Sequence, residues 1–149
     1  MIFNCIDNQS VEFRITNYQY PDTTDREYDG NWLNIYLNVK SKTENWQSID
    51  PSLATWEVQR IIEWLEELSK NKVPKSNNLE FIEPNLCFSL IENFSDKSKR
   101  IRITFELESR PKSAIEGCEY FVDFDAEETE LKRLCEELSN ELKKFPIRK

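Results

Sequence analysis

Carboxylates are the only side chains in this sequence that are numerous enough to support acid–base or metal chemistry, with 28 Asp and Glu among 149 residues. One group, Asp22, Asp25, Glu27 and Asp29, lies in a stretch whose Pro, Asp and Gly residues predict a loop. Loop oxygens often bind Ca²⁺, but this spacing is not that of an EF-hand loop, and Gly30 follows the acidic run instead of lying within it. We therefore expect an acidic loop without a metal.

A second group of carboxylates, Glu63, Glu66 and Glu67, lies on a segment with helical periodicity, and residues 127–130 hold a third group. Paired carboxylates can act as a general acid and base. Acidic residues on a helix face are ordinarily solvated, and those at a helix N-terminus also interact favourably with the helix dipole. We therefore interpret these residues as exposed charges, available to a binding partner.

Residue types that are absent or rare exclude most catalytic designs. The sequence has no His, which removes His-based triads, the commonest general base at neutral pH and imidazole metal ligands. Its two glycines, Gly30 and Gly117, are too few for a phosphate-binding loop or a dinucleotide-binding motif. The four cysteines are widely separated and form no CxxC pair. We expect no enzymatic activity, no cofactor and no metal.

The net charge of −8 bears on the choice of partner. Nucleic acids and anionic membranes are bound through clusters of Lys and Arg, so we expect neither as a direct ligand. A basic protein partner suits the charge, because opposite charges steer encounter. The N-terminus lacks a signal-peptide pattern, and no apolar run approaches the ~18 residues of a membrane span. We expect a cytoplasmic protein whose cysteines are reduced, buried small hydrophobes.

The stretch 46–68 predicts a turn followed by an amphipathic helix. Pro51 suits a helix entry, Thr55 is the favoured N-cap, and Pro74 requires the helix to end by Asn71. Val58, Ile61, Ile62, Leu65 and Leu68 recur every three or four positions and form the apolar face. The polar face is expected to contain Glu57, Arg60, Glu63, Glu66 and Glu67.

A second helix is expected near the C-terminus. Asp125 with Glu128 three residues later has the pattern of a capping box, and Pro146 ends the helix. Its apolar face is Leu131, Leu134, Cys135, Leu138 and Leu142.

Most of the remaining chain alternates apolar and polar residues with the period of a half-buried strand. Because the links are of turn length, we expect an antiparallel meander. The predicted fold is a single α+β domain over 1–149, a curved antiparallel sheet with two helices packed on one face or end. The order of strands then helix occurs twice, which also permits an arrangement in two halves. Strands are predicted at residues 2–6, 11–18, 31–39, 46–49, 79–82, 86–91, 101–108 and 119–124.

Two aromatic residues, Trp32 and Tyr36, share the nominally polar face of the predicted strand 31–39. They indicate either a second covered face or a contact surface, since Trp and Tyr are enriched in interfaces. Basic residues concentrate elsewhere, between Lys97 and Arg102, which leaves residues 19–68 acidic. This separation of charge favours a binding function.

Several blocks of the sequence resemble the WapI-type immunity proteins of bacteria. The similarity spans residues 11–110, and its most specific parts are the DPSL-x-TWE and EPNL-x-F blocks. The matching residues are Asn31-Trp32-Leu33, Trp46, Asp50-Pro51-Ser52-Leu53, Thr55-Trp56-Glu57, Trp64-Leu65, Glu83-Pro84-Asn85-Leu86 and Phe88. These positions hold turns, helix starts and aromatic residues, so they bear on the fold more than on a particular partner.

The resemblance implies a cytoplasmic protein that binds and blocks the toxic C-terminal domain of a wall-associated, contact-dependent inhibition protein. The best-known toxins of this family act on RNA as nucleases, and carboxylates suit the basic groove of such an enzyme. Our expected binding residues are the loop 22–29, the aromatic pair Trp32 and Tyr36, and the carboxylates Glu63, Glu66 and Glu67. The alternative is a non-enzymatic interaction or scaffold domain, which Trp32 and Tyr36 would join as a homodimer.

Overall fold

The computed structural model describes residues 1–23, 29–94 and 97–149, and within them the strands form two antiparallel four-stranded sheets. Sheet A has the order β1-β2-β3-β4 and sheet B the order β5-β6-β7-β8. This confirms the α+β class with two helices, but the strands form two sheets where one curved sheet was expected. The strands are β1 Ile2–Asn4, β2 Ser10–Tyr18, β3 Trp32–Lys40, β4 Asn45–Ala54, β5 Asn78–Leu79, β6 Leu86–Asn93, β7 Ser98–Phe105 and β8 Tyr120–Glu127, and the helices are α1 Thr55–Ser69 and α2 Glu128–Lys143.

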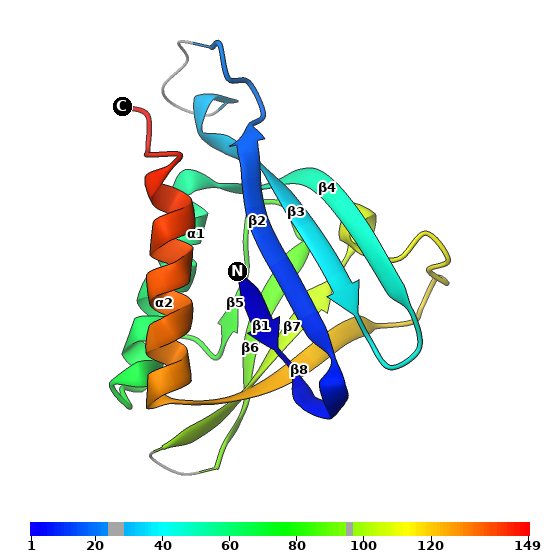
Figure 1. The fold of residues 1–149 in the computed structure, drawn as a ribbon, viewed down its shortest axis with the longest axis vertical. Coiled ribbons are helices and arrows are strands. Elements are labelled where there is room, and N and C mark those ends of the chain that lie inside the picture. Colours follow the sequence, from blue (N-terminus) through cyan, green and yellow to red (C-terminus); the bar gives the residue numbers. More distant parts are fainter. Residues whose placement is uncertain (24–28, 95–96) are drawn as a thin grey trace.

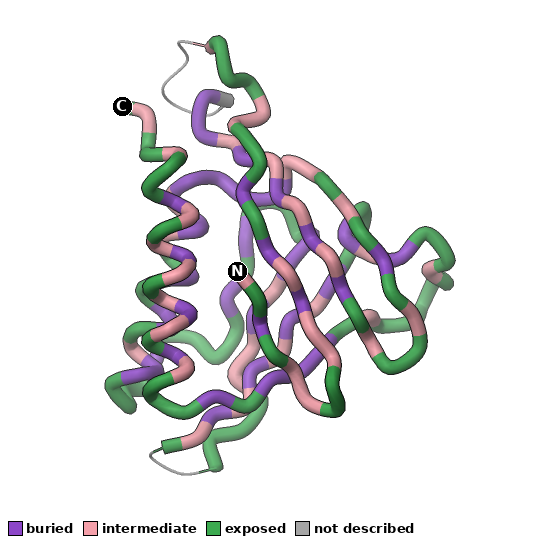
Figure 2. Tube along the Cα trace, viewed as in Figure 1, coloured by how far each residue is buried: buried purple, intermediate pink, exposed green. Residues whose placement is uncertain are grey.

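The two sheets face each other, and α1 and α2 lie side by side along one side of them (Figure 1). Burial alternates along β2 and β3, because only one face of sheet A is turned toward the core (Figure 2). Aromatic rings join the inner faces: the Phe3 ring lies 5.4 Å from that of Phe124, and the Trp46 ring 5.5 Å from that of Phe105. Each sheet therefore covers the apolar face of the other.

The segment before α1 differs from the prediction. Residues 50–54 continue β4 as an extended edge strand, so Pro51 lies in a strand and not at a helix start. Pro is tolerated there because an edge strand has no partner for one row of its N–H groups. The N-cap is Ala54 instead of Thr55. The predicted apolar face of α1 is buried as expected, and the helix ends before Asn71.

The start of α2 was also predicted wrongly. Its N-cap is Glu127, and Asp125 belongs to β8, where its carboxylate accepts two hydrogen bonds from Arg100 at 2.8 and 3.0 Å. Asp125, two residues before the N-cap, thus pairs across the sheet instead of capping the helix. The apolar face of α2 is as predicted, with Leu131, Leu134, Leu138 and Leu142 buried and Cys135 partly buried.

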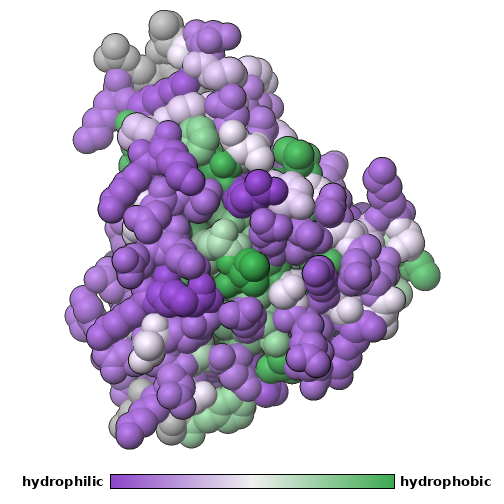
Figure 3. Space-filling view, in the orientation of Figure 1, coloured by the Kyte–Doolittle hydropathy of each residue, from purple (hydrophilic) through white to green (hydrophobic). Residues whose placement is uncertain are grey.

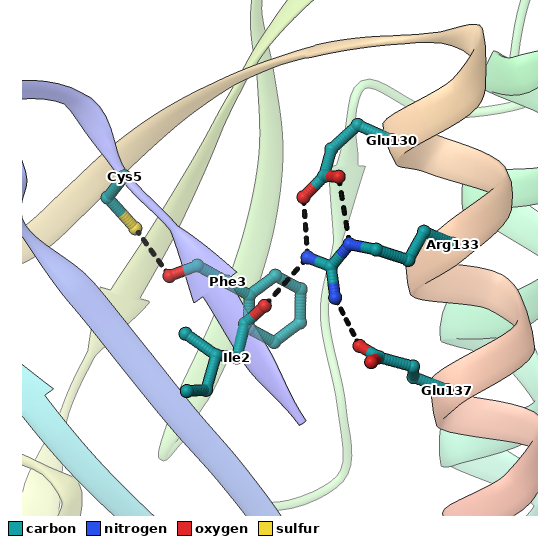
Figure 4. A network of polar contacts seen from close by, with 6 residues as sticks. All are labelled: Ile2, Phe3, Cys5, Glu130, Arg133 and Glu137. Atoms are coloured by element: carbon teal, nitrogen blue, oxygen red, sulfur yellow. Dashed lines mark hydrogen bonds and ion pairs between the residues drawn. The ribbon is translucent and has the colours of Figure 1, made fainter.

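Helix α2 supplies hydrogen-bonding groups to the edge of sheet A. Arg133 donates 2.9 Å to the carbonyl of Ile2 in the edge strand β1, while Glu130 and Glu137 hold the guanidinium in place (Figure 4). Further along the helix, Glu141 accepts a 3.1 Å hydrogen bond from the Ile15 N–H of β2. An open sheet edge carries unpaired backbone N–H and C=O groups, and these two contacts supply hydrogen-bond partners for two of them.

Helix α1 contacts the chain that follows β5, the edge strand of sheet B. The Glu57 carboxylate is buried and accepts from the Ala54 N–H at 2.9 Å and from the Ile82 N–H at 2.8 Å. Arg60 donates 3.2 Å to the carbonyl of Glu80, just beyond the edge strand β5. Glu57 was expected on the solvated face, so its burial corrects that prediction. Its role is to start the helix and to anchor the chain after β5.

We predict that Glu57→Ala lowers the free energy of unfolding by about 2–4 kcal/mol, because the substitution leaves two N–H groups without their charged acceptor. Denaturant unfolding followed by circular dichroism measures this. The exposed Glu63 lies on the same helix, and Glu63→Ala should change stability by less than about 0.5 kcal/mol. Equal effects of the two substitutions would contradict the anchoring role of Glu57.

Candidate functional site

The outer face of sheet A presents a row of three side chains across neighbouring strands. Arg14, Tyr36 and Ile49 are directly paired in the register of β2, β3 and β4. The Arg14 guanidinium lies 4.4 Å from the centre of the Tyr36 ring and 3.2 Å from Glu12. Ile49 ends the row with 63% of its surface exposed. An exposed Ile beside an aromatic ring is typical of a contact surface.

The predicted aromatic pair lies on this face. Tyr36 is half-buried beneath Arg14, and Trp32, also half-buried, is the first residue of β3. No second layer of strands or helices covers this face in the described part of the chain (Figure 1). Of the two alternatives, a second covered face is therefore not observed in these residues, and the contact surface stays a prediction.

The acidic loop joins β2 to β3 at one end of sheet A. Asp22 is exposed, and Asp29 opens the short 3₁₀ turn Asp29–Asn31, while Asp25 and Glu27 lie outside the described residues. The C-terminal tail holds the described part of this loop. Arg148 donates to the carbonyls of Tyr20 at 3.0 Å and Pro21 at 2.9 Å, and its guanidinium lies 3.6 Å from the centre of the Tyr18 ring.

The helical carboxylates lie elsewhere. Helix α1 is behind α2 in Figure 1, away from the outer face of sheet A, so Glu63, Glu66 and Glu67 do not join the aromatic pair. Lys70 pairs with Glu66 at 3.4 Å. A shallow groove of about 290 Å³ contains Glu63 and Glu67, but Arg60 and Lys75 line it too. The predicted site residues thus fall on three surfaces, and that of α1 is partly neutralised.

A further acidic cluster was missed by sequence reasoning. Asn85 is buried between the two sheets, and its amide donates to Asp50 of β4 at 3.1 Å and to Glu108 at 3.5 Å. Burial, then the negative charge of Glu108, raise the pKa of Asp50; the Asn85 hydrogen bond opposes this, and Glu83 raises it further. Three carboxylates from distant segments therefore repel one another here. The signal available in the sequence was that Asp50 and Asn85 belong to the two most specific blocks.

Each of these carboxylates follows an exposed aliphatic residue in the chain. Ile49 precedes Asp50, Ile82 precedes Glu83 with 61% exposure, and Leu107 precedes Glu108 with 45% exposure. Leu107 has a backbone φ of 51°, a left-handed conformation that a branched residue rarely adopts. The cluster thus combines negative charge with solvated apolar surface.

The expected basic region is not a free positive surface. Arg102 forms two hydrogen bonds with Asp123 at 2.8 and 3.0 Å, repeating the neighbouring Arg100–Asp125 pair, and Lys99 is buried against Asn71 and Asn93. Strand β8 therefore neutralises the arginines of β7. The separation of charge seen along the sequence does not persist on the surface of sheet B.

Thiol reactivity and metal binding depend on the surroundings of the cysteines and of the described acidic side chains. Burial, then the charge of Asp123, raise the pKa of Cys5 to about 12, and burial, then Glu66, raise that of Cys135 to about 11, so both thiols stay protonated. Cys118 is exposed and Cys5, Cys87 and Cys135 are only partly buried, which corrects the expectation of four buried cysteines. Within residues 1–23, 29–94 and 97–149, no three Asp, Glu or Cys residues are placed to hold a metal ion. Neither helix in this part of the chain has the length and apolarity needed to cross a membrane.

We predict that Asp50→Asn raises the melting temperature at pH 7 by about 1–2 °C, an effect kept small by solvent screening. An acid whose pKa is raised by folding lowers stability as pH rises from its unfolded value through its folded one. The gain should therefore be largest at neutral pH and disappear near pH 3.8, the ordinary Asp value. Melting curves from pH 3.5 to 7 measure it; a loss of stability at pH 7 would show that the Asn85 hydrogen bond outweighs the repulsion.

Comparison with known proteins gives the same family as the sequence blocks described above. No curated protein and no solved structure matches the chain. The model of the immunity protein WapI-like family matches residues 1–146, which is almost the whole chain and extends beyond the 11–110 region identified from the blocks. The structure brings the blocks together, since Asp50 contacts Asn85, Glu57 contacts the backbone before Glu83, and Thr55 contacts Asn31 at 2.8 Å. The chain belongs to the WapI-like family of immunity proteins.

Proposed function

We propose that this protein binds and neutralises the toxic C-terminal domain of a contact-dependent inhibition toxin, in the cytoplasm of the cell it protects. The observation that carries the proposal is the family match over residues 1–146. The net charge of −8 supports it, because an acidic surface attracts and orients a basic domain. Neutralisation of this kind is stoichiometric and needs no catalytic group in the immunity protein.

A toxin that acts on RNA needs a basic groove for the phosphate backbone. Carboxylates that enter this groove occupy the positions of phosphates and exclude the substrate. We propose this mode of blocking for the present chain, with a nuclease as the toxin. The Asp22 carboxylate is exposed, and the loop to which it belongs leads directly into β3 with Trp32 and Tyr36. Loop and aromatic pair are thus neighbours, whereas Glu63, Glu66 and Glu67 would form a separate contact on α1.

The first prediction of this proposal is protection. Where a neighbouring gene encodes a large secreted protein, expression of its toxic C-terminal domain should arrest growth of a bacterial host, and co-expression of the chain should restore it. The two chains should then elute together in a 1:1 complex, measured by light scattering. An unrelated immunity protein is the control. Continued arrest, with the chain eluting only as its own dimer, would favour the homodimeric scaffold instead.

The second prediction concerns the acidic loop. Changing Asp22, Asp25 and Asp29 to Asn and Glu27 to Gln removes four charges and should weaken toxin binding about 10-fold at low salt, with a smaller loss at high salt because screening already weakens those charges. Calorimetric titration at 50 and 500 mM NaCl measures both. Changing Glu63, Glu66 and Glu67 to Gln tests the α1 surface in parallel. If a variant binds the toxin as tightly as the wild type does, the surface that it alters is not part of the binding site.

A further inference from the structure

The edge strand β4 carries both an exposed apolar side chain and an acidic side chain. Two β4 residues, Pro51 and Ser52, stand opposite the single β3 residue Asn34, so the register shifts beside Asp50. Ile49 pairs with Tyr36 on the outer face of sheet A, whereas Asp50 pairs with the core residue Ile35 and turns toward sheet B. The exposed Ile and the cluster carboxylate therefore flank the same edge strand.

Two other segments meet this edge from sheet B. The turn before β6 contributes Glu83 and Asn85, and the 3₁₀ turn Leu107–Ser109 contributes Glu108, which shares the Asn85 amide with Asp50. Thus β4, the β5–β6 turn and the turn after β7 converge on one buried amide. We call the surface around Asn85 the Asn85 patch, which consists of Ile49, Asp50, Ile82, Glu83, Leu107 and Glu108.

The charge of the patch is left available in the described part of the chain. Its ion pairs do not include Asp50, Glu83 or Glu108. The nearby Arg110 donates to the carbonyl of Leu107 at 3.3 Å and not to a carboxylate. Mutually repelling carboxylates beside solvated aliphatic side chains complement a cation that is itself surrounded by apolar groups.

Resting on the proposed function, we infer that the Asn85 patch is a further docking surface for the toxin, separate from the acidic loop, and that it receives a Lys or Arg side chain of the toxin between the three carboxylates. Ile49, Ile82 and Leu107, each next to one of these carboxylates in the chain, supply the exposed apolar surface beside that cation. Binding relieves the repulsion within the cluster, so the patch is a less favourable arrangement in the free protein than in the complex.

Ile115 and Glu116 provide a matched control. Ile115 is 65% exposed, close to the 63% of Ile49, and Glu116 follows it as Asp50 follows Ile49, but the pair lies in the loop before β8. The double substitutions Ile49→Thr/Asp50→Asn and Ile115→Thr/Glu116→Gln therefore remove the same chemistry from two places. Leu107→Gly/Glu108→Gln is a third variant, in which Gly suits the positive φ at that position.

The test is calorimetric titration of each variant with the toxic domain from the protection experiment, at 50 and 500 mM NaCl, with melting temperatures measured in parallel. We expect both patch variants to bind at least 10-fold more weakly at 50 mM NaCl and to lose most of the wild-type salt dependence. The control variant should bind within 3-fold of the wild type. The patch variants should melt at or above the wild-type temperature. If Ile49→Thr/Asp50→Asn does not fold, the binding of Leu107→Gly/Glu108→Gln tests the patch instead.

Two negative outcomes are distinct. Suppose that the wild type binds the toxic domain and the patch variants bind as tightly with the same salt dependence. The inference that the Asn85 patch docks the toxin is then wrong, while the proposed function stands. If the wild-type chain neither binds the domain nor protects the host, the proposed function fails, and the docking surface fails with it.

Discussion

The unpaired edges of two open sheets are the constraint on which this structure depends. Each sheet has four strands and does not close, so each leaves backbone N–H and C=O groups that need partners. The helices supply them in a crossed arrangement. Helix α1 follows sheet A in the chain but anchors the segment around β5 of sheet B, through Glu57 and Arg60. Helix α2 follows sheet B but contacts the edge of sheet A, through Arg133 and Glu141.

This arrangement also decides which surfaces remain for a partner. The helices α1 and α2 occupy the side of β1 and β5 (Figure 1), whereas the opposite strands are contacted by short 3₁₀ turns, β4 by Leu107–Ser109 and β8 by Ile6–Asn8. In the orientation of Figure 3 the surface is mostly hydrophilic, with hydrophobic side chains in small, separate groups. At β4 the strand edge is interrupted by Pro51 and by the shifted register, which disfavours pairing with another strand. Recognition at this edge therefore depends on side chains more than on backbone pairing.

The sequence predicted what depends on local periodicity. The alternation in β2, β3 and β7 and the apolar stripes of both helices identify the core faces correctly. It failed where a tertiary contact overrides a local signal. The 50–55 segment has the composition of a helix start, yet it is extended because it pairs with β3. Glu57 has the helical position of a solvated residue, yet it is buried and accepts a hydrogen bond from the Ile82 N–H. Division into two sheets depends on which strands pair, which periodicity does not encode.

The same limit applies to the candidate site. Trp32 and Tyr36 could be placed on an outer face because strand period alone sets it, but the cluster around Asn85 joins residues 23 to 58 positions apart. Charge along the chain was likewise a poor guide to charge on the surface, because β8 places Asp123 and Asp125 against the arginines of β7. The local sequence predicts a strand, whereas the register between strands determines which residues share a surface.

The crossed helices have a consequence for synthesis on the ribosome. Ile2 and Ile15 are made more than a hundred residues before their partners Arg133 and Glu141. The β1 edge therefore lacks these partners until α2 is released. Contacts this distant in the chain slow folding and prolong exposure of a strand edge during translation. The contacts that protect the β1 edge form only after α2 has left the ribosome.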